Sequence, residues 1–394
     1  MRRISTAERR NRLAIRHRLV PWERTDDVVA IADGLVALHS SDPATVFLSA
    51  GVRMENPSIS AMEEALYRHR SLVRHHAFRR TIWVMTPEVA RWAHASATVK
   101  IASAERKKIL SIVGAQPDID DAERWWADAL ADVRSLLAEA GPLPTREIGK
   151  RLPELTRRLT MGAATRHPAD VAAHTRLLLL AGFEATLVRT APLHGWNTAE
   201  YSWSDVIDWL GVPLAGAEVG ESAAAILERW LDRFGPATEV DIRWWTGWTA
   251  TQMRAALDAI GAEPVMVEGD QQAWDLVDAT NVGEVGPWVA LLPGLDATTM
   301  GWKERSWYLS DAATARTFDR SSNAGPTIWR NGEVIGGWVQ RDDGSVAHEL
   351  FVDLSQRERQ LLDEQIDRFV ELVGDTRVRV RFPARNQREL LADG

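Results

Sequence analysis

The chain of 394 residues contains no cysteine. This absence excludes disulfide bonds, thiolate metal sites and a cysteine nucleophile together. The sequence also lacks any run of about 18 uncharged apolar residues, which is the length that a membrane-spanning helix needs. Its N-terminus is rich in arginine but is not followed by the apolar core of a secretory signal. We therefore expect a cytoplasmic protein that does not enter a membrane.

Negative charge is in excess overall, and the formal net charge of −8 at first argues against a nucleic-acid partner. The basic residues, however, are concentrated toward one end of the chain. Residues 1–24 hold eight arginines and two glutamates, and residues 68–108 hold ten Lys or Arg against two acids. Because an anionic partner responds to the local field, these segments predict a DNA-binding surface. For either segment alone, a solvated basic face without a partner is the alternative.

The N-terminal part shows the order of elements that is typical of a winged helix. An apolar stripe predicts a helix over residues 27–38, which delivers His39 to the C-terminal end of that helix. A capping box at Ser60 predicts a further helix. Residues 71–75 and 80–86 then read as two strands whose Arg and His side chains point outward.

Two later segments repeat this plan. Each has a helix, a Gly-Pro break, a Thr cap and a second helix, with the breaks at Gly141-Pro142 and Gly235-Pro236. Each is then followed by a further helix and a strand pair, so the repetition predicts three tandem winged-helix modules.

From Trp288 onward, the sequence consists of short apolar runs that are separated by turn residues. The strongest hairpin signal among these turns is Asn331-Gly332. This pattern predicts a small antiparallel sheet or barrel. A capping box at Ser355 starts a last helix, and the alternating segment 377–382 is predicted as a closing strand. We expect a mainly α protein with α+β character, with residues 1–110, 111–215 and 216–285 as the three modules and residues 286–394 as the β domain.

Four motifs stand out along the chain, namely Leu35–Pro43, Arg70–Arg74 with Arg79–Trp83, Trp244–Trp248, and Leu291–Asp296 continuing through Gly301-Trp302. Together they resemble the bacterial winged-helix family that includes the AlkZ-like DNA glycosylases, over nearly the whole chain. The resemblance implies three winged helices arranged in a C-shape and braced by a C-terminal antiparallel β-barrel. It also implies a monomer that binds double-stranded DNA and excises bulky alkylated purines or unhooks interstrand crosslinks, with no cofactor and no metal.

The resemblance places the catalytic site at His39-Ser40-Ser41, where the family carries a Gln-apolar-Gln or Gln-apolar-Asp motif. Excision of a cationic alkylpurine needs little more than a placed water and a stabilised oxocarbenium-like state. His39 could accept the proton of that water, Ser41 could orient it, and Asp42 could supply negative charge. Alternatively, His39 interacts with a helix C-terminus and Asp42 caps the next segment.

The basic segments supply the candidate DNA contacts, which are Arg53, Arg70, Arg74, His75, His76, Arg79, Arg80 and Trp83. Trp83 lies among basic residues on a predicted wing, where an aromatic ring could wedge into a groove. Core packing is the alternative for this tryptophan and for the others.

Other kinds of site are less well supported by the sequence. A serine hydrolase would need a strained nucleophile elbow, and no Gly-x-Ser-x-Gly occurs. The histidines His69, His75 and His76 are interspersed with arginines, which disfavours a metal ion. A non-catalytic DNA-binding or regulatory protein, and a protein that binds a small ligand in the channel, remain as alternative functions.

Overall fold

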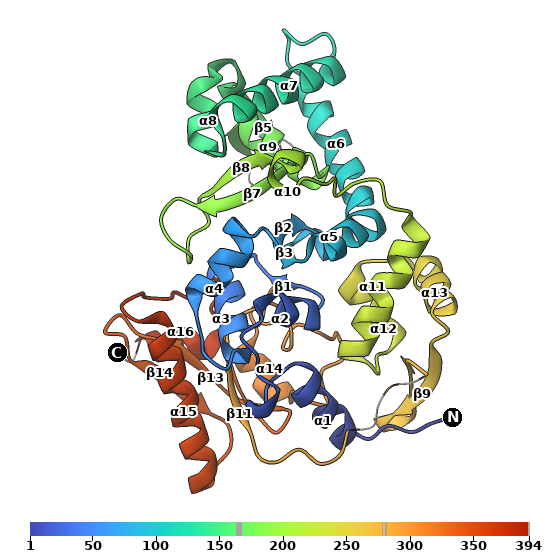
Figure 1. The fold of residues 1–394 in the computed structure, drawn as a ribbon, viewed down its shortest axis with the longest axis vertical. Helices are drawn as coiled ribbons and strands as arrows, with labels where there is room; N and C mark the ends of the chain where they lie inside the picture. Colours follow the sequence, from blue (N-terminus) through green and yellow to red (C-terminus); the bar gives the residue numbers. More distant parts are fainter. Residues whose placement is uncertain (163–167, 278, 280–281, 393–394) are drawn as a thin grey trace.

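The computed structural model describes residues 1–162, 168–277, 279 and 282–392. It is a mixed structure in which helices predominate (Figure 1). The elements that precede residue 114 are α1 (Thr6–Arg16), α2 (Val28–Gly34), β1 (Leu38–His39), α3 (Pro43–Arg53), α4 (Ile59–Glu63), β2 (Val73–His76), β3 (Ile82–Met85), α5 (Pro87–Ala93) and α6 (Val99–Val113). Among the described residues no helix combines the length and the apolar character needed to cross a membrane.

The following part of the chain forms one end of the molecule, at the top of Figure 1. Its elements are α7 (Ala122–Ala140), β4 (Leu143–Pro144), α8 (Thr145–Arg151), β5 (Arg158–Met161), β6 (Ala169–Ala172), α9 (Ala173–Phe183), β7 (Leu187–Pro192), β8 (Tyr201–Asp205) and α10 (Val206–Leu210). A helical group then follows, with α11 (Val219–Phe234), α12 (Glu239–Thr246), α13 (Ala250–Ala259) and the hairpin of β9 (Glu263–Val267) and β10 (Gln271–Asp275).

A six-stranded antiparallel sheet, here called the central sheet, joins the first two parts of the chain. Its order is β1-β3-β2-β7-β8-β4. The pair that links them is β2 with β7, where Arg74 lies opposite Arg189. Two strand pairs that were predicted as separate wings therefore share one sheet, whereas β9 and β10 form a hairpin of their own.

The predicted helix over residues 27–38 is wrong in its second half. Asp27 caps α2 through the N–H groups of Val29 and Ala30, but the helix ends at Gly34. Val36 then adopts a positive φ of 62°, and the chain continues as β1. His39 is consequently a strand residue paired with Trp83, and it does not lie at a helix end.

Helix α3 is buried along nearly its whole length, between the central sheet and the C-terminal part. Asp42 is its N-cap and accepts the N–H of Ala44 at 3.1 Å, and Pro43 occupies the first turn. The expectation that Asp42 caps the next segment is thus confirmed.

Several arginines of the N-terminal segment pair with acidic groups of the protein. Arg2 and Arg12 both contact Asp275, at 2.5 and 2.8 Å, and Arg3 contacts Asp270 at 2.8 Å. These contacts fix the segment against the β9–β10 hairpin near the N-terminus in Figure 1. Part of the basic charge in residues 1–24 is therefore neutralised by the protein's own carboxylates.

The C-terminal part contains a four-stranded sheet of order β11-β12-β13-β14. Its elements are β11 (Val289–Leu292), α14 (Asp311–Thr317), β12 (Thr327–Arg330), β13 (Glu333–Gln340), β14 (Val346–Leu350), α15 (Gln356–Val373) and α16 (Arg385–Ala392). The hairpin at Asn331-Gly332 is confirmed, with positive φ at both residues. The capping box of Ser355 with Glu358 is confirmed as well.

The predicted closed barrel is not formed by the described residues, whose C-terminal sheet stays open. One reason is that residues 377–382 are not a strand: the N–H of Val378 donates to the side chain of Gln340 at 2.9 Å instead of to a neighbouring strand. Helices α15 and α16 contact the sheet and provide the cover that further strands would have given.

Candidate functional site

A cleft of about 1180 Å³ opens over one face of the central sheet. Its walls come from the residues that follow β1, from β2 and β3, from α8 and α9, from the β7–β8 loop, and from residues 381–382. The β7–β8 loop reaches the C-terminal part, since Asn197 Nδ2 donates to the carbonyl oxygen of Arg377 at 3.4 Å. Three parts of the chain that lie far apart in sequence therefore enclose the cleft.

Strand alternation decides which residues face this cleft. On one face of the sheet lie Ser40, Ile82, His76, Arg189 and Trp203, all of which line the cleft. The position of Ser40 is fixed by its N–H, which donates to the carbonyl oxygen of Ile82 at 2.9 Å. Within the strands, the residues next to them, such as His75, Trp83 and Ser202, point to the opposite face and do not line the cleft.

His39 lies on that opposite face. It is 4% exposed, and its ring packs edge-on against Trp83 at a centroid distance of 4.6 Å. Burial lowers its pKa to about 3, and the positive charge of Arg79 adds to this effect. His39 therefore does not line the cleft, and its catalytic role stays a prediction. Its Nδ1 instead accepts the N–H of Ser41 at 3.3 Å.

Ser41 lines the cleft, because the chain has left the strand before it enters α3. Asp42 does not line it. Burial raises the pKa of the Asp42 carboxyl group, while the N–H groups of Ala44 and Arg381 favour its ionised form. Of the three catalytic candidates, the structure thus brings only Ser41 to the cleft, and His39 and Asp42 do not line it.

Of the candidate DNA contacts, only His76 and Arg80 line the cleft. Arg80 is exposed and contacts Glu105 at 3.1 Å. The prediction that Arg74 and His75 point outward is wrong, since both are buried. The physical reason is that β2 is an inner strand of the central sheet, between β3 and β7.

The remaining candidates have internal partners. Arg53 is fully buried and paired with Asp296, and Trp83 is 1% exposed in the core. Arg70 is exposed, but its guanidinium lies over the ring of Trp209 at 4.1 Å, and that of Arg79 lies over Trp244 at 3.9 Å. His75 contacts His94 at 3.2 Å, and the part of the chain that the structure describes contains no group of metal ligands.

Sequence reasoning missed most of the polar residues that line the cleft. Positive charge comes from Arg80, Arg146, Lys150, Arg189 and Arg381, and negative charge comes from Glu147 and Glu200. Both carboxylates have partners: Glu147 contacts Lys150 at 2.5 Å, and Glu200 contacts His194 at 3.5 Å.

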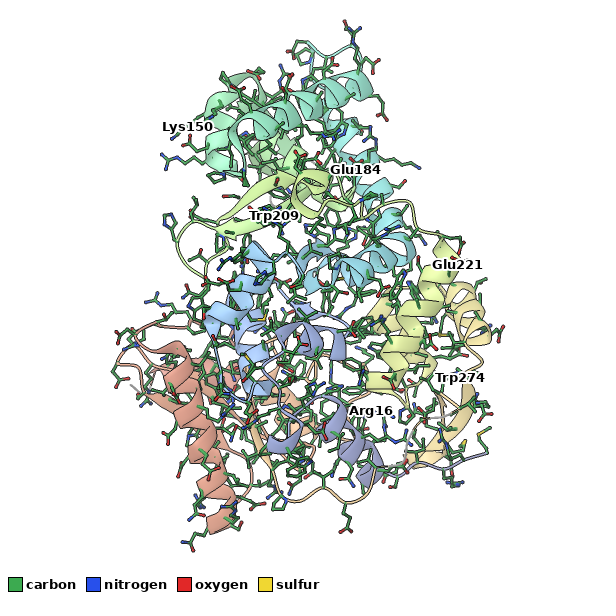
Figure 2. All side chains as sticks on the ribbon, viewed as in Figure 1. Arg16, Lys150, Glu184, Trp209, Glu221 and Trp274 are labelled. Carbon is green, nitrogen blue, oxygen red and sulfur yellow. The ribbon has the colours of Figure 1, made fainter. Side chains whose placement is uncertain are left out.

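The missed cations lie outside the two basic segments of the sequence, residues 1–24 and 68–108. Figure 2 shows Lys150 projecting from the upper part of the molecule. A local signal existed only for Arg381, in the basic segment 377–382.

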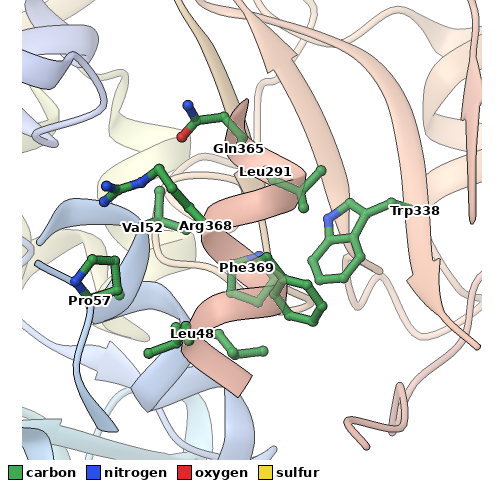
Figure 3. A pocket seen from close by; sticks show the side chains of 11 residues that line it. Leu48, Val52, Pro57, Leu291, Trp338, Gln365, Arg368 and Phe369 are labelled. Carbon is green, nitrogen blue, oxygen red and sulfur yellow. The ribbon is translucent and has the colours of Figure 1, made fainter. Parts of the chain in front are cut away.

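A second, much smaller pocket lies between α3, α15 and the C-terminal sheet (Figure 3). Its volume is about 20 Å³, enough for about one water molecule. Leu48, Leu291 and Phe369 give it an apolar wall, and Arg368 beside it donates to the carbonyl oxygen of Met54 at 2.6 Å. It is too small to admit a base or a sugar, whereas the cleft has room for both.

Comparison with known proteins agrees with this architecture. Among solved structures, the DNA glycosylase AlkZ of Streptomyces sahachiroi superposes with a TM-score of 0.69 at 17% sequence identity, covering 98% of this chain and 100% of that one. This likeness shows a shared fold. No curated protein sequence matches the chain. A family model described as DNA glycosylase AlkZ-like matches residues 32–372, most of the chain, and the chain therefore belongs to the AlkZ-like DNA glycosylase family.

Proposed function

We propose that this protein is a monomeric DNA repair enzyme that binds double-stranded DNA and hydrolyses the N-glycosidic bond of alkylated or crosslinked purines. Such an activity would serve repair or resistance to a genotoxin. The observation that carries the proposal is the cleft itself. It is lined by five Lys or Arg and two acids, it borders the Ser40-Ser41 motif, and its volume of about 1180 Å³ admits a nucleotide drawn out of a duplex.

The chemistry asks for a water molecule placed below the sugar. The water oxygen forms a bond to C1′ while the bond from C1′ to the purine nitrogen breaks, and the electron pair of that bond neutralises the cationic base. One proton of the water passes to solvent or to a nearby base. Because the leaving group is already activated, placement of the water by the Ser41 hydroxyl is the main requirement.

His39 then has a positioning role in place of the acid–base role expected from the sequence. Its low pKa keeps the ring neutral at pH 7, so that Nδ1 remains able to accept the N–H of Ser41. This hydrogen bond fixes the turn that presents the Ser41 side chain to the cleft. We expect His39→Ala to lower excision by loosening Ser41, with a smaller effect on DNA affinity.

The experiment is a single-turnover assay on a duplex that contains one 7-methylguanine, with the released base measured by chromatography. We expect release by the wild type, a loss of at least about tenfold in Ser41→Ala, and no change in Ser111→Ala, an exposed serine on α6. If no lesion from a panel of N3- and N7-alkylated purines and crosslinks is excised, glycosylase activity is ruled out.

A non-catalytic DNA-binding protein is the second candidate. The observation that favours it is that both carboxylates lining the cleft, Glu147 and Glu200, already have cationic or histidine partners. No unpaired carboxylate among the described cleft residues would then stabilise an oxocarbenium-like state. This candidate predicts salt-dependent duplex binding without base release, and binding that is unchanged in Ser41→Ala.

A further inference from the structure

We propose that the floor of the cleft is a subsite for one phosphodiester group of a nucleic-acid backbone, held by Arg189, Tyr201 and Ser40 and supported from behind by Arg74. The inference rests on the proposed function, because it assigns a part of the DNA substrate to a part of the same cleft. It is carried by four polar side chains whose hydrogen-bonding capacity the protein itself leaves unused.

Arg74 is the positioning residue of this group. It is 2% exposed and lies beneath the cleft. Its Nε donates to Ser40 Oγ at 2.9 Å, and its Nη1 donates to the hydroxyl of Tyr67 at 3.2 Å. Since the oxygen of Ser40 accepts from Arg74, the hydroxyl hydrogen of Ser40 is left to donate elsewhere, and Ser40 lines the cleft. Arg74 thereby prepares a donor for a ligand.

Positive charge at the floor is not compensated by the protein. Arg189 lies opposite Arg74 across the β2–β7 pair, and neither guanidinium forms an ion pair with a carboxylate of the described residues. Burial lowers the pKa of Arg189 to about 10. The nearby Arg74 lowers this pKa further, whereas Tyr201 raises it. Buried cations are normally paired, so two unpaired guanidinium groups side by side indicate a place for an anion.

Tyr201 adds a donor that has no partner. Its ring supports the Arg74 guanidinium at 4.3 Å, which a phenylalanine would do equally well. Tyr201 lines the cleft with a side chain that is 8% exposed, and its buried hydroxyl group makes no hydrogen bond within the described part of the chain. Nη2 of Arg74 is also unpartnered there. Because buried polar groups are nearly always satisfied, these atoms point to a ligand that completes them.

A phosphodiester fits this arrangement better than a free small anion. The floor offers one guanidinium and two hydroxyl groups that can donate, which matches a tetrahedral monoanion with two unesterified oxygens. The rim of the same cleft carries Arg80, Arg146 and Lys150, all exposed. Neighbouring phosphates of a continuous strand would meet these cations, whereas a free anion would use the floor alone.

The test uses the full chain and a short duplex with one tetrahydrofuran abasic analogue, in which one phosphodiester at a time is replaced by a neutral methylphosphonate. We expect a loss of affinity of roughly 10- to 100-fold at one linkage near the analogue. Tyr201→Phe and Arg189→Gln should weaken binding to the fully charged duplex but not to the duplex that carries that one neutral linkage. Arg254→Gln, an exposed arginine on α13, is the matched control.

Tyr201→Phe also separates a binding role from a structural one. It removes only an unpartnered hydroxyl, so its thermal unfolding midpoint should equal or exceed that of the wild type. Variants that bind every duplex like the wild type, or that lose the same factor on charged and neutral linkages, would overturn the proposal.

Failure of the proposed function has a different signature. If the wild type binds no duplex, the DNA proposal fails, and titration with inorganic phosphate followed by tryptophan fluorescence decides on the subsite. Saturation that disappears in Arg189→Gln would support an anion site at the floor, and the absence of any saturation would overturn it. If duplexes bind but no base is released, only the catalytic part of the proposed function is lost.

Discussion

Removal of either partner from the buried Arg53–Asp296 pair should destabilise the whole molecule. Both side chains are fully buried, and the guanidinium binds the carboxylate through two hydrogen bonds of 2.8 and 2.9 Å. Ser49 Oγ and the N–H of Thr298 also donate to Asp296, at 2.6 and 2.9 Å. The pair therefore ties α3 to the segment that follows β11.

The expected loss in the free energy of unfolding depends on the charge that each substitution leaves buried without a partner. Asp296→Ala leaves a buried guanidinium without its counter-charge, and Arg53→Met leaves a buried carboxylate with two neutral donors. Each should lower the free energy of unfolding by about 3–5 kcal/mol. In the double variant Arg53→Met with Asp296→Leu no buried charge remains, so the loss should be smaller than the sum of the two single losses by at least about 2 kcal/mol.

Urea unfolding followed by the fluorescence of the eighteen tryptophans measures these losses. The sequence placed Arg53 among the DNA contacts, and the same variants test that expectation. If Arg53→Met costs less than about 1 kcal/mol and instead reduces the salt dependence of DNA binding, then the assignment of Arg53 to the core is mistaken.

Two further perturbations follow from other buried groups. Burial lowers the pKa values of His17 and His39 to about 3, so the unfolded chain binds more protons than the folded one below about pH 6.5. The free energy of unfolding should be highest above that pH and should fall as the pH decreases, by about 2 kcal/mol for each histidine at pH 5. Urea unfolding midpoints at pH 7 and pH 5 measure this loss. Asp241→Ala removes the acceptor for the N–H groups of Lys303 and Glu304, both at 2.8 Å, and should cost about 2–4 kcal/mol by the same assay; a loss below 1 kcal/mol would contradict this.

Local signals in the sequence predicted local structure well. Thr86 caps α5, Ser355 and Glu358 form the capping box of α15, and Asn331-Gly332 turns the β12–β13 hairpin. Each of these features depends on residues within a few positions of one another, where side-chain hydrogen bonds and backbone preferences decide the outcome. The paired strands β2 and β3 belong to the same class, because a short connection brings them together.

Contacts between distant segments could not be derived in this way. The β2–β7 pair joins residues more than a hundred positions apart and turns β2 into an inner strand, which buries Arg74 and His75. The alternation of residues 377–382 is typical of a strand, yet a strand also needs a neighbour to pair with. Gln340 takes the N–H of Val378 instead, and the segment ends as part of the cleft wall.

The motif around His39 shows how one such error changes a functional assignment. At the end of a helix, the side chains of neighbouring polar residues can all lie near the same terminus, so His39, Ser40 and Ser41 would share a site. In a strand, consecutive side chains point to opposite faces, so that only one of His39 and Ser40 can face the cleft. Pairing of Leu38 with Val84 selects Ser40 and turns His39 toward Trp83. Moving His39 into the cleft would require β1 to shift by one residue along β3, which would turn Ser40 away from Arg74 and take the His39 ring off Trp83. The core therefore fixes the register, and the register decides which side chain of this motif faces the cleft.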